Sequence, residues 1–485
     1  DREGKPLTRG ATTEHTLLNA GFNLLGTSLA AQEYWDNHRA LDYLLTRKDI
    51  DPEHIGVYGS SGGGTQTAYY IGLDPRVKVA AICSFFSTRE RTMELQGPSD
   101  GCQHIPYEGR EQLEVPDFAL MMAPRPLLIL SGKYDFVDLW GAQQGFAELQ
   151  QCYKVLGVPE KVDMLTVETG HGLGAEKRQK LVSWFKRWLK DNQSPVKKAA
   201  QDRFQLSDML CTTKGQVNVS MPGALSIMQE NVNQLDEWAS KRETFLSKGK
   251  KTVQTKMLDL LGLKGLPDHK IRIEATGHDS MREYEQYKFQ LIREGEMPVP
   301  CILIMPSRAN ADSPVELRLQ EEGKGTYLSE YANFAAALTE GKILLLADLR
   351  GLGETTDPAF YTDAKYWNRE YRNAMISMHI GRPIMGQRVV DILTLLDFCS
   401  EHELLKGHPV KVFANGIYGP AAIHAAYLDE RINSVEIKHS VKTWKEYIER
   451  PMQWDMYSNV LYGALKYYDL PDLIRLSNRP IRFAD

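Results

Sequence analysis

The sequence predicts an α/β protein with two domains, each built on a mostly parallel sheet flanked by helices. Short β-branched runs alternate with amphipathic helical stretches along the first half of the chain. A Gly-x-Ser-x-Gly turn joins one such run to a helix, and a weaker copy of the same pattern recurs in the second half. With 485 residues, the chain is too long for a single hydrophobic core.

The composition is that of an ordinary globular protein, with 42% hydrophobic and 25% charged residues. A formal net charge of −5 argues against a nucleic-acid partner, because such proteins usually present a basic face. No apolar run reaches the length needed to span a bilayer. The sequence therefore predicts neither a nucleic-acid partner nor a membrane span, and it leaves the oligomeric state open.

Cysteine usage predicts neither a metal site nor a disulfide framework. The six cysteines show no Cys-x-x-Cys spacing, so we expect individually buried thiols, with Cys102 in a loop where pairing stays open. No motif indicates a cofactor. The cysteines are Cys83, Cys102, Cys152, Cys211, Cys301 and Cys399.

A nucleophile turn is predicted between residues 55 and 70, where a β-branched and aromatic run enters Gly59-Ser60-Ser61-Gly62-Gly63 and a helix follows. Such a turn strains the backbone of Ser61 and lifts its hydroxyl to the C-terminal edge of the sheet. The Gly62 N–H would stabilise an oxyanion. A phosphate-binding loop is the alternative, but no Gly-Lys-Ser/Thr follows. The sequence shows no second oxyanion donor.

An acid and a base follow two later strands. Strand 127–130 leads to Asp135, and strand 162–167 leads to His171, which has a glycine on each side. The chain order Ser, Asp, His is that of α/β-hydrolases. His171 would accept the Ser61 proton and return it to the leaving alcohol, while Asp135 would hold the imidazole tautomer.

Asp138 is the alternative acid, because it lies only three residues beyond Asp135. His54 and His104 are expected to be surface histidines.

Further elements follow from periodicity and turn residues. In the first domain we expect a helix over 31–47, a strand over 77–83, an irregular stretch over 89–109, a helix over 146–156 and a closing helix with an apolar stripe over 181–189. Beyond a polar linker at 191–201 we expect short strands within 209–219, helices over 224–248 and 253–261, and a strand over 342–349.

Segments of the first half recur in the second half. Leu41-Asp42-Tyr43 matches Leu396-Asp397-Phe398 at an offset of 355 (396 − 41), and Leu73-Asp74-Pro75-Arg76 matches Leu428-Asp429-Glu430-Arg431 at the same offset. Arg125-Pro126 matches Arg479-Pro480 at 354 (479 − 125). This register places Gly416 opposite Ser61, so the second domain is expected to be inactive.

The predicted domains are a catalytic domain at 1–192, a helical linker at 193–265 and a divergent repeat at 266–485. Aligning the two copies leaves the first without N-terminal strands and the second without its C-terminal part. We therefore expect both domains to be truncated and the chain to be an internal fragment.

Several motifs carry a family resemblance: Trp35-Asp36, Leu41-Asp42-Tyr43-Leu44, Gly59-Ser60-Ser61-Gly62-Gly63-Gly64, Ala123-Pro124-Arg125-Pro126 and Gly170-His171-Gly172. They resemble the acetyl xylan esterase group of α/β-hydrolases, which is related to prolyl-oligopeptidase-type serine hydrolases, in a two-domain form with a degenerate C-terminal repeat. The resemblance implies a secreted or periplasmic enzyme that deacetylates plant polysaccharides, with Ser61 as nucleophile, Asp135 as acid and His171 as base. The chain, which begins at Asp1, shows no signal-peptide pattern.

The leading hypothesis is a serine carboxyl-ester hydrolase that acts on an acylated carbohydrate through an acyl-serine intermediate. A prolyl-oligopeptidase-type serine peptidase is the second hypothesis. Such peptidases usually carry a β-propeller before the hydrolase domain and an aromatic residue beside the serine, whereas here the C-terminal neighbour is another hydrolase-like domain and Ser60 and Gly62 are small. A non-catalytic carbohydrate-binding or scaffold protein is the third.

Overall fold

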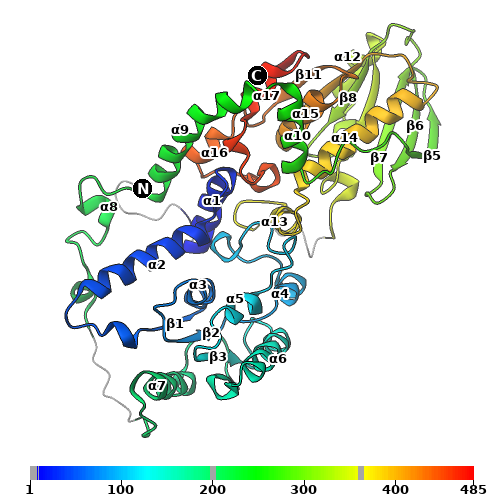
Figure 1. The fold of residues 1–485 in the computed structure, drawn as a ribbon. Coiled ribbons are helices and arrows are strands. Elements are labelled where there is room, and N and C mark those ends of the chain that lie inside the picture. The colour runs from blue at the N-terminus through cyan, green and yellow to red at the C-terminus, as the bar shows by residue number, and fades with distance from the viewer. Residues whose placement is uncertain (1–7, 9, 197–203, 359–364, 485) are drawn as a thin grey trace. The chain divides into compact units, whose positions relative to one another are not determined.

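The computed structural model describes residues 8, 10–196, 204–358 and 365–484. The chain divides into two compact units (Figure 1). The first comprises Asp1–Asn19 and Ser28–Ser226, and the second comprises Ala20–Thr27 and Ile227–Asp485. The predicted domain boundaries at 192 and 265 stay predictions, because the division into two units reflects contacts within the chain and does not show which parts fold separately.

The first unit contains a four-stranded parallel sheet with the strand order β1-β2-β3-β4. Its strands are β1 (Gly56–Ser60), β2 (Val79–Cys83), β3 (Leu127–Gly132) and β4 (Val162–Val167). Ser60 pairs with Cys83 and Gly132 pairs with Val167, so the carboxyl ends of the strands share one edge of the sheet. All four strands were predicted from the sequence, and the α/β fold class is confirmed.

Helices cover both faces of this sheet, and all residues of β2 and β3 are therefore buried. Ile82 and Ile129 pack with residues of α2, α3, α5 and α6, whereas Ala81 and Leu130 pack against Leu181 and Trp184 of α7 (Figure 1). The helices of this unit that lie wholly inside it are α2 (Leu29–Thr46), α3 (Gly62–Ile71), α4 (Arg89–Gln96), α5 (Val115–Leu120), α6 (Leu139–Val155), α7 (Ala175–Lys190) and α8 (Val217–Ser220).

Two sequence-based predictions for this unit need correction, and one helix was not predicted. The stretch 89–109 is not wholly irregular, since it contains α4, a polar helix without an apolar stripe. The short strands expected within 209–219 are wrong, because this stretch holds α8 and the end of a 3-10 turn at Leu206–Met209. An N-terminal helix, α1 (Ala11–Leu24), was not predicted from its mixed sequence.

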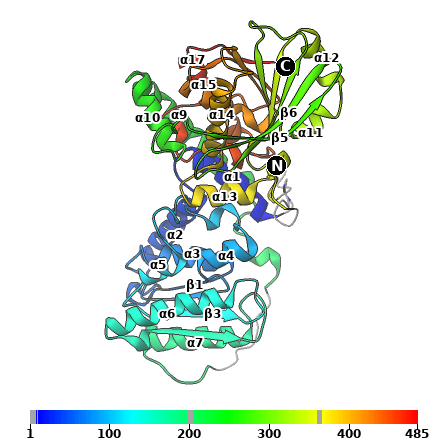
Figure 2. The same cartoon turned by 90° about the vertical axis from the view of Figure 1, so that its right-hand side faces the viewer.

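The second unit contains an eight-stranded mixed sheet with the order β12-β11-β10-β8-β9-β7-β6-β5. The strands from β12 to β9 are parallel, and β7, β6 and β5 add on antiparallel. The long strands β5 and β6 form one end of it (Figure 2). The strands are β5 (Arg272–Ser280), β6 (Tyr284–Ile292), β7 (Val299–Pro306), β8 (Val315–Leu319), β9 (Ile343–Ala347), β10 (Val410–Asn415), β11 (Ile432–Lys438) and β12 (Ile481–Phe483).

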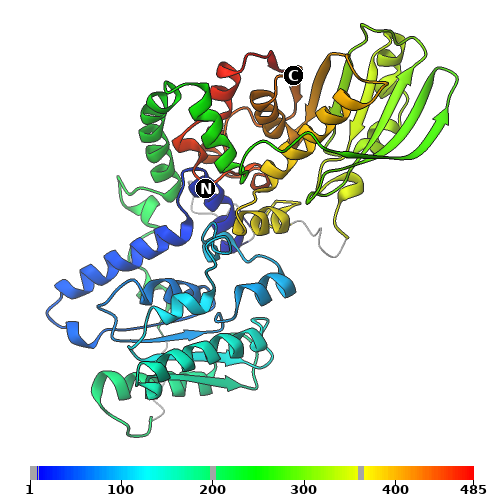
Figure 3. The ribbon, with the colours of Figure 1, turned by 45° about the vertical axis from the view of Figure 1, so that its right-hand side comes forward.

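The central helix of this unit is α14 (Ile384–Glu401), which is buried along nearly its whole length and lies along the sheet (Figure 3). The predicted helices over 224–248 and 253–261 are confirmed as α9 and α10. The remaining helices are α9 (Ile227–Leu246), α10 (Lys250–Leu260), α11 (Lys324–Leu328), α12 (Ala332–Thr339), α13 (Tyr371–His379), α15 (Gly419–Leu428), α16 (Lys445–Glu449) and α17 (Leu470–Leu476). Among the described residues, no helix is both long and apolar enough to cross a membrane.

Elements of the first unit recur in the second at the predicted offset. Helix α2 at 29–46, moved by 355 positions, becomes 384–401, which are the bounds of α14 (384 − 29 and 401 − 46). The ion pairs recur as well. Arg76 contacts Asp42 and Asp74 in the first unit, and at the same offset Arg431 contacts Asp397 and Asp429 in the second.

Candidate active site

Ser61 occupies a strained turn between β1 and α3. Its backbone has φ 58° and ψ −124°, a conformation that residues with a side chain rarely adopt. Gly59 permits the turn, because a Cβ at this position would lie 1.9 Å from the carbonyl oxygen of Gly63. The sharp reversal leaves Ser61 at the carboxyl end of β1, as the Gly-x-Ser-x-Gly pattern predicts.

The residue after Ser61 begins helix α3. Gly62 stands in the first helical turn, where backbone N–H groups have no partner inside the helix and the helix dipole is positive. The Ser61 N–H donates to the carbonyl of Cys83 over 3.0 Å, which fixes the turn against the end of β2. Gly62 therefore has the position that an oxyanion donor needs.

His171 and Asp135 form a hydrogen-bonded pair. The distance from His171 Nδ1 to Asp135 Oδ1 is 2.8 Å, and the side chains are 30% and 1% exposed respectively. The loops that carry them are joined, since the Tyr134 N–H donates to the carbonyl of Thr169 over 3.1 Å. Gly132 allows this approach, because a Cβ there would lie 2.6 Å from that same carbonyl oxygen.

Hydrogen bonds hold the Asp135 carboxylate in its ionised form. Burial raises the pKa of Asp135, but the hydrogen bonds from His171 and from the Val137 N–H lower it further, so the pKa lies below its ordinary value. An ionised carboxylate at Nδ1 leaves the opposite ring nitrogen of His171 free to act as a base.

Asp138, the alternative acid, has a different role in the structure. It caps helix α6 by accepting a hydrogen bond from the Gly141 N–H over 2.7 Å, and it pairs with Arg91 at 3.3 Å. His54 is exposed and pairs with Asp51, as expected of a surface histidine. The same prediction is wrong for His104, which is only 3% exposed.

The structure brings Ser61, Asp135 and His171 to the carboxyl ends of β1, β3 and β4, at one edge of the parallel sheet. Within the part of the chain that the structure describes, Ser61 and His171 share no hydrogen bond between side chains.

Two residues that the sequence analysis missed support the His171 loop. Ser84 Oγ accepts hydrogen bonds from the Gly172 N–H over 3.0 Å and from Lys177 Nζ over 3.2 Å. Lys177 is only 1% exposed and also donates to the carbonyl of Gly172 over 3.0 Å. Because Lys177 stands in the polar first turns of α7, the periodicity of that helix gave no sign of its burial.

An aromatic ring lies against the His171 side chain, and two further exposed rings follow the same strand. The ring of Phe136 stacks on His171 with the centroids 4.3 Å apart and the planes at 21°. Tyr134, Phe136 and Trp140 are each more than half exposed. Exposed rings at this edge offer flat apolar surface to a ligand.

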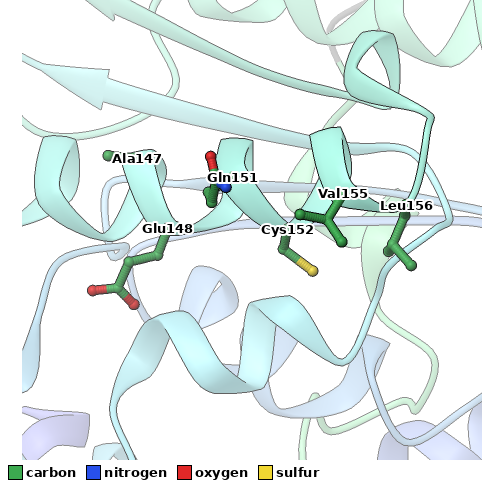
Figure 4. A pocket seen from close by; sticks show the side chains of 6 residues that line it. All are labelled: Ala147, Glu148, Gln151, Cys152, Val155 and Leu156. Carbon is green, nitrogen blue, oxygen red and sulfur yellow. The ribbon is translucent and has the colours of Figure 1, made fainter.

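A separate hollow lies on the outer face of α6 (Figure 4). Its lining is largely apolar and includes no candidate site residue, so it is not assigned to the chemistry of Ser61. The lining residues are Ala147, Glu148, Gln151, Cys152, Val155 and Leu156.

The second unit has a turn at the position corresponding to the nucleophile. Gly416 follows β10 and has φ 63°. The carboxylate of Glu321 fills the space beside it, since a Cβ on Gly416 would lie 1.8 Å from Glu321 Oε2. The same oxygen accepts the Ile417 N–H over 3.1 Å, and Ile417 corresponds to Gly62 (417 − 355).

Residues 25–192 match the prolyl oligopeptidase family. The Bacillus subtilis protein YtaP, which is provisionally named a hydrolase, is 26% identical over 168 residues, or 34% of this chain and 56% of that protein. The chain thus spans about half the length of this curated relative. These matches confirm the predicted resemblance to prolyl-oligopeptidase-related hydrolases for the first unit.

Solved structures with esterase names are also similar. A Bacteroides fragilis protein provisionally named an acetyl xylan esterase is 14% identical, covering 54% of this chain and 75% of its own, with a TM-score of 0.44. Acetyl xylan esterase 1 of Thermoanaerobacterium is 13% identical, covering 48% and 77%, with a TM-score of 0.34. At these TM-scores the two similarities do not bear on the fold assignment, which rests on the observed sheet and on the family match.

Proposed function

We propose that the first unit is a serine carboxyl-ester hydrolase that removes acyl groups from carbohydrate esters through an acyl-serine intermediate. One observation carries this proposal. Ser61 stands in a strained strand-to-helix turn at the same sheet edge as a histidine that is hydrogen-bonded to a buried, ionised carboxylate.

The chemistry follows from these positions. His171 removes the proton from Ser61 Oγ as the oxygen attacks the ester carbonyl, and the Gly62 N–H stabilises the oxyanion that forms. The imidazolium then returns its proton to the leaving alcohol oxygen as the ester bond breaks. Water repeats the sequence on the acyl-serine and releases the carboxylic acid, while Asp135 stabilises the imidazolium in both halves.

A carbohydrate ester is proposed as the substrate on two grounds. The motifs around Ser61 and His171 resemble those of acetyl xylan esterases, and the exposed rings of Tyr134, Phe136 and Trp140 offer apolar faces on which sugar rings can pack. By the same resemblance, we propose that the enzyme works outside the cytoplasm, in a secreted or periplasmic setting.

A serine peptidase of the prolyl-oligopeptidase type is the second candidate, favoured by the family that residues 25–192 match. Proline rings also pack on aromatic faces, so Phe136 alone does not separate the two candidates. They differ in the leaving group, since a peptidase must protonate an amine whereas an esterase releases an alcohol.

We further propose that the second unit is a duplicated and inactive copy of the first. The recurrence of α2 as α14 and of the arginine–aspartate clusters at one offset supports the duplication. Gly416 has no side chain to act as a nucleophile, and Glu321 occupies the position in which an oxyanion would form. Such a copy would support the fold or help to position the substrate.

The test compares three substrates: acetylated xylan, an aryl acetate and a prolyl peptide amide. Ser61→Ala is set beside Ser60→Ala, a matched change at the neighbouring serine. We expect acetate release from both esters, no peptide cleavage, and a loss of about 10⁵-fold or more in kcat for Ser61→Ala only. Peptide cleavage that depends on Ser61 would favour the peptidase, and turnover of the aryl acetate alone would refute the carbohydrate substrate. If Ser61→Ala retains full activity, the proposed nucleophile is wrong.

A further inference from the structure

Four metal-ligating side chains meet in the first unit, away from the residues assigned to catalysis. His15 comes from α1 and Glu33 from α2, while Asp100 and Cys102 come from the turn around the short 3-10 helix at Gly101–Gln103. His15 Nδ1 lies 3.2 Å from Cys102 Sγ, 3.8 Å from Asp100 Oδ2 and 4.0 Å from Glu33 Oε1. Cys102 Sγ lies 3.3 Å from Asp100 Oδ2.

These separations match the spacing of ligand atoms around a tetrahedral ion. Zinc binds nitrogen, sulfur and oxygen ligands at about 2.0 to 2.3 Å, which places neighbouring ligand atoms about 3.3 to 3.6 Å apart. The ligand atoms of His15, Asp100 and Cys102 all lie within 4.8 Å of one another. Shifts of a few tenths of an ångström would therefore bring these three atoms around one centre, and Glu33 Oε1 lies 4.0 Å from His15 Nδ1.

The charges at this cluster also call for a cation. Asp100 and Cys102 are each 5% exposed, and the Glu33 side chain is 17% exposed. Within the described part of the chain, neither carboxylate forms an ion pair with a lysine or an arginine. Asp100 accepts hydrogen bonds from the Gln103 side-chain amide over 2.6 Å and from the Cys102 thiol, and His15 is the one basic side chain paired with each carboxylate in this part of the chain. A buried carboxylate and a half-buried one beside a thiol are costly unless a positive charge compensates them.

The turn that carries Asp100 and Cys102 is fastened to α1. A Cβ on Gly101 would lie 2.7 Å from Asn19 Cβ and 3.0 Å from the carbonyl oxygen of His15, so only glycine allows this approach. The Gly101 N–H donates to Thr16 Oγ1 over 3.0 Å. Contacts between the Gly101 backbone and α1 thus hold His15 and Cys102 together, independently of any contact between their own side chains.

We propose that His15, Glu33, Asp100 and Cys102 form a binding site for a transition-metal dication of the zinc class. The donor set selects this class, because Mg²⁺ and Ca²⁺ prefer oxygen ligands alone, whereas imidazole and thiolate suit Zn²⁺. Binding displaces the proton of the Cys102 thiol to solvent and requires His15 Nδ1 to be unprotonated. Four protein ligands leave no open position for a water, so the ion is structural and ties α1 and α2 to the turn.

The experiment measures metal directly, so its outcome does not depend on the proposed hydrolase activity. The whole chain is treated with chelator, given ZnCl₂ or CoCl₂, separated from free ion and analysed for bound metal. We expect about one ion per chain, a thiolate-to-Co²⁺ charge-transfer band and a higher Tm in the presence of Zn²⁺. Cys102→Ser should lose the band and bind metal at least about 10-fold more weakly, while Cys211→Ser, at an exposed cysteine, should match the parent.

His15→Gln guards against a folding defect in Cys102→Ser. It keeps the thiol and should weaken metal binding while its circular dichroism and chelator-treated Tm stay close to those of the parent protein. The proposal is overturned if the parent binds no zinc at equimolar concentration. It is equally overturned if Cys102→Ser or His15→Gln retains the full affinity and the zinc-dependent Tm.

Discussion

Ser61 and Gly416, 355 positions apart, both have a positive φ, 58° and 63°. Each stands between a strand that pairs in parallel with its neighbours and a helical turn, so the positive φ persists where no serine is present. Strain at Ser61 is therefore a property of the strand-to-helix connection as well as of the proposed chemistry. In the second unit a glycine relieves this strain, and the Glu321 carboxylate accepts a hydrogen bond from the Ile417 N–H of the turn.

Asp135→Asn is expected to lower kcat for ester cleavage by about 10⁴-fold, because an amide cannot hold the imidazole tautomer or stabilise the imidazolium. KM should change little, since Asp135 is buried and unavailable to substrate. Steady-state kinetics on an aryl acetate measures both quantities.

Asp138→Asn is the matched control. Asp138 caps α6, and asparagine is as good a cap as aspartate, so this variant should keep nearly the full rate. Equal losses in the two variants would mean that the assignment of Asp135 as the acid is wrong.

Gly59→Ala should lower the free energy of unfolding by more than about 3 kcal/mol, because its Cβ would lie 1.9 Å from a backbone oxygen that cannot move independently of α3. Gly63→Ala meets nothing within 4 Å at a helical position, and it should be neutral or stabilising by up to about 1 kcal/mol. Urea unfolding of the first unit, followed by its tryptophan signal, compares the two. A well-folded Gly59→Ala would refute the close approach in the turn.

Asp74 gives the first unit a pH-dependent contribution to stability. Its carboxylate accepts the Tyr70 hydroxyl over 2.7 Å and Arg76 Nε over 2.8 Å. Burial raises the pKa of Asp74, but these hydrogen bonds lower it more, and the pKa lies well below its ordinary value. A carboxyl whose pKa is depressed by folding stabilises the protein above the unfolded pKa, at about 3.9, and loses this contribution as the pH falls.

Asp74→Asn should therefore cost about 2 to 4 kcal/mol near pH 7, and the difference from the parent should shrink as the pH falls toward 3. Tm measured across this pH range provides the test, with Asp236→Asn as an exposed control. A constant difference across the range would contradict the ion pair with Arg76 as its cause.

The strands and the three catalytic candidates could be predicted because their signals are local. A β-branched run followed by glycine and one polar residue marks a strand end, and parallel strands bring their carboxyl ends together wherever they lie in the sequence. This is why Asp135 and His171 were predicted at one edge of the sheet although 36 residues separate them.

The His15, Asp100 and Cys102 cluster could not be predicted in the same way. Its members come from a helix without a clear apolar stripe and from a turn 85 residues later (100 − 15), and no spacing rule joins them. The expectation of individually buried thiols was also wrong for Cys211, which is exposed. Tertiary packing through Gly101 creates the cluster, and local sequence does not encode it.

The Glu321 carboxylate packed against Gly416 should make the stability cost of a side chain at Gly416 depend on Glu321. Gly416→Ala places a side chain at positive φ, which costs about 1 kcal/mol, and pushes against the Glu321 carboxylate, which adds to that cost. When Glu321 is also replaced by alanine, the cost of the clash with its carboxylate should vanish. Only the cost of the positive φ should remain. Glu322→Ala, at the exposed neighbour, should leave the cost of Gly416→Ala unchanged. A double-mutant cycle on the unfolding of the second unit measures this coupling, and additive effects would contradict the contact.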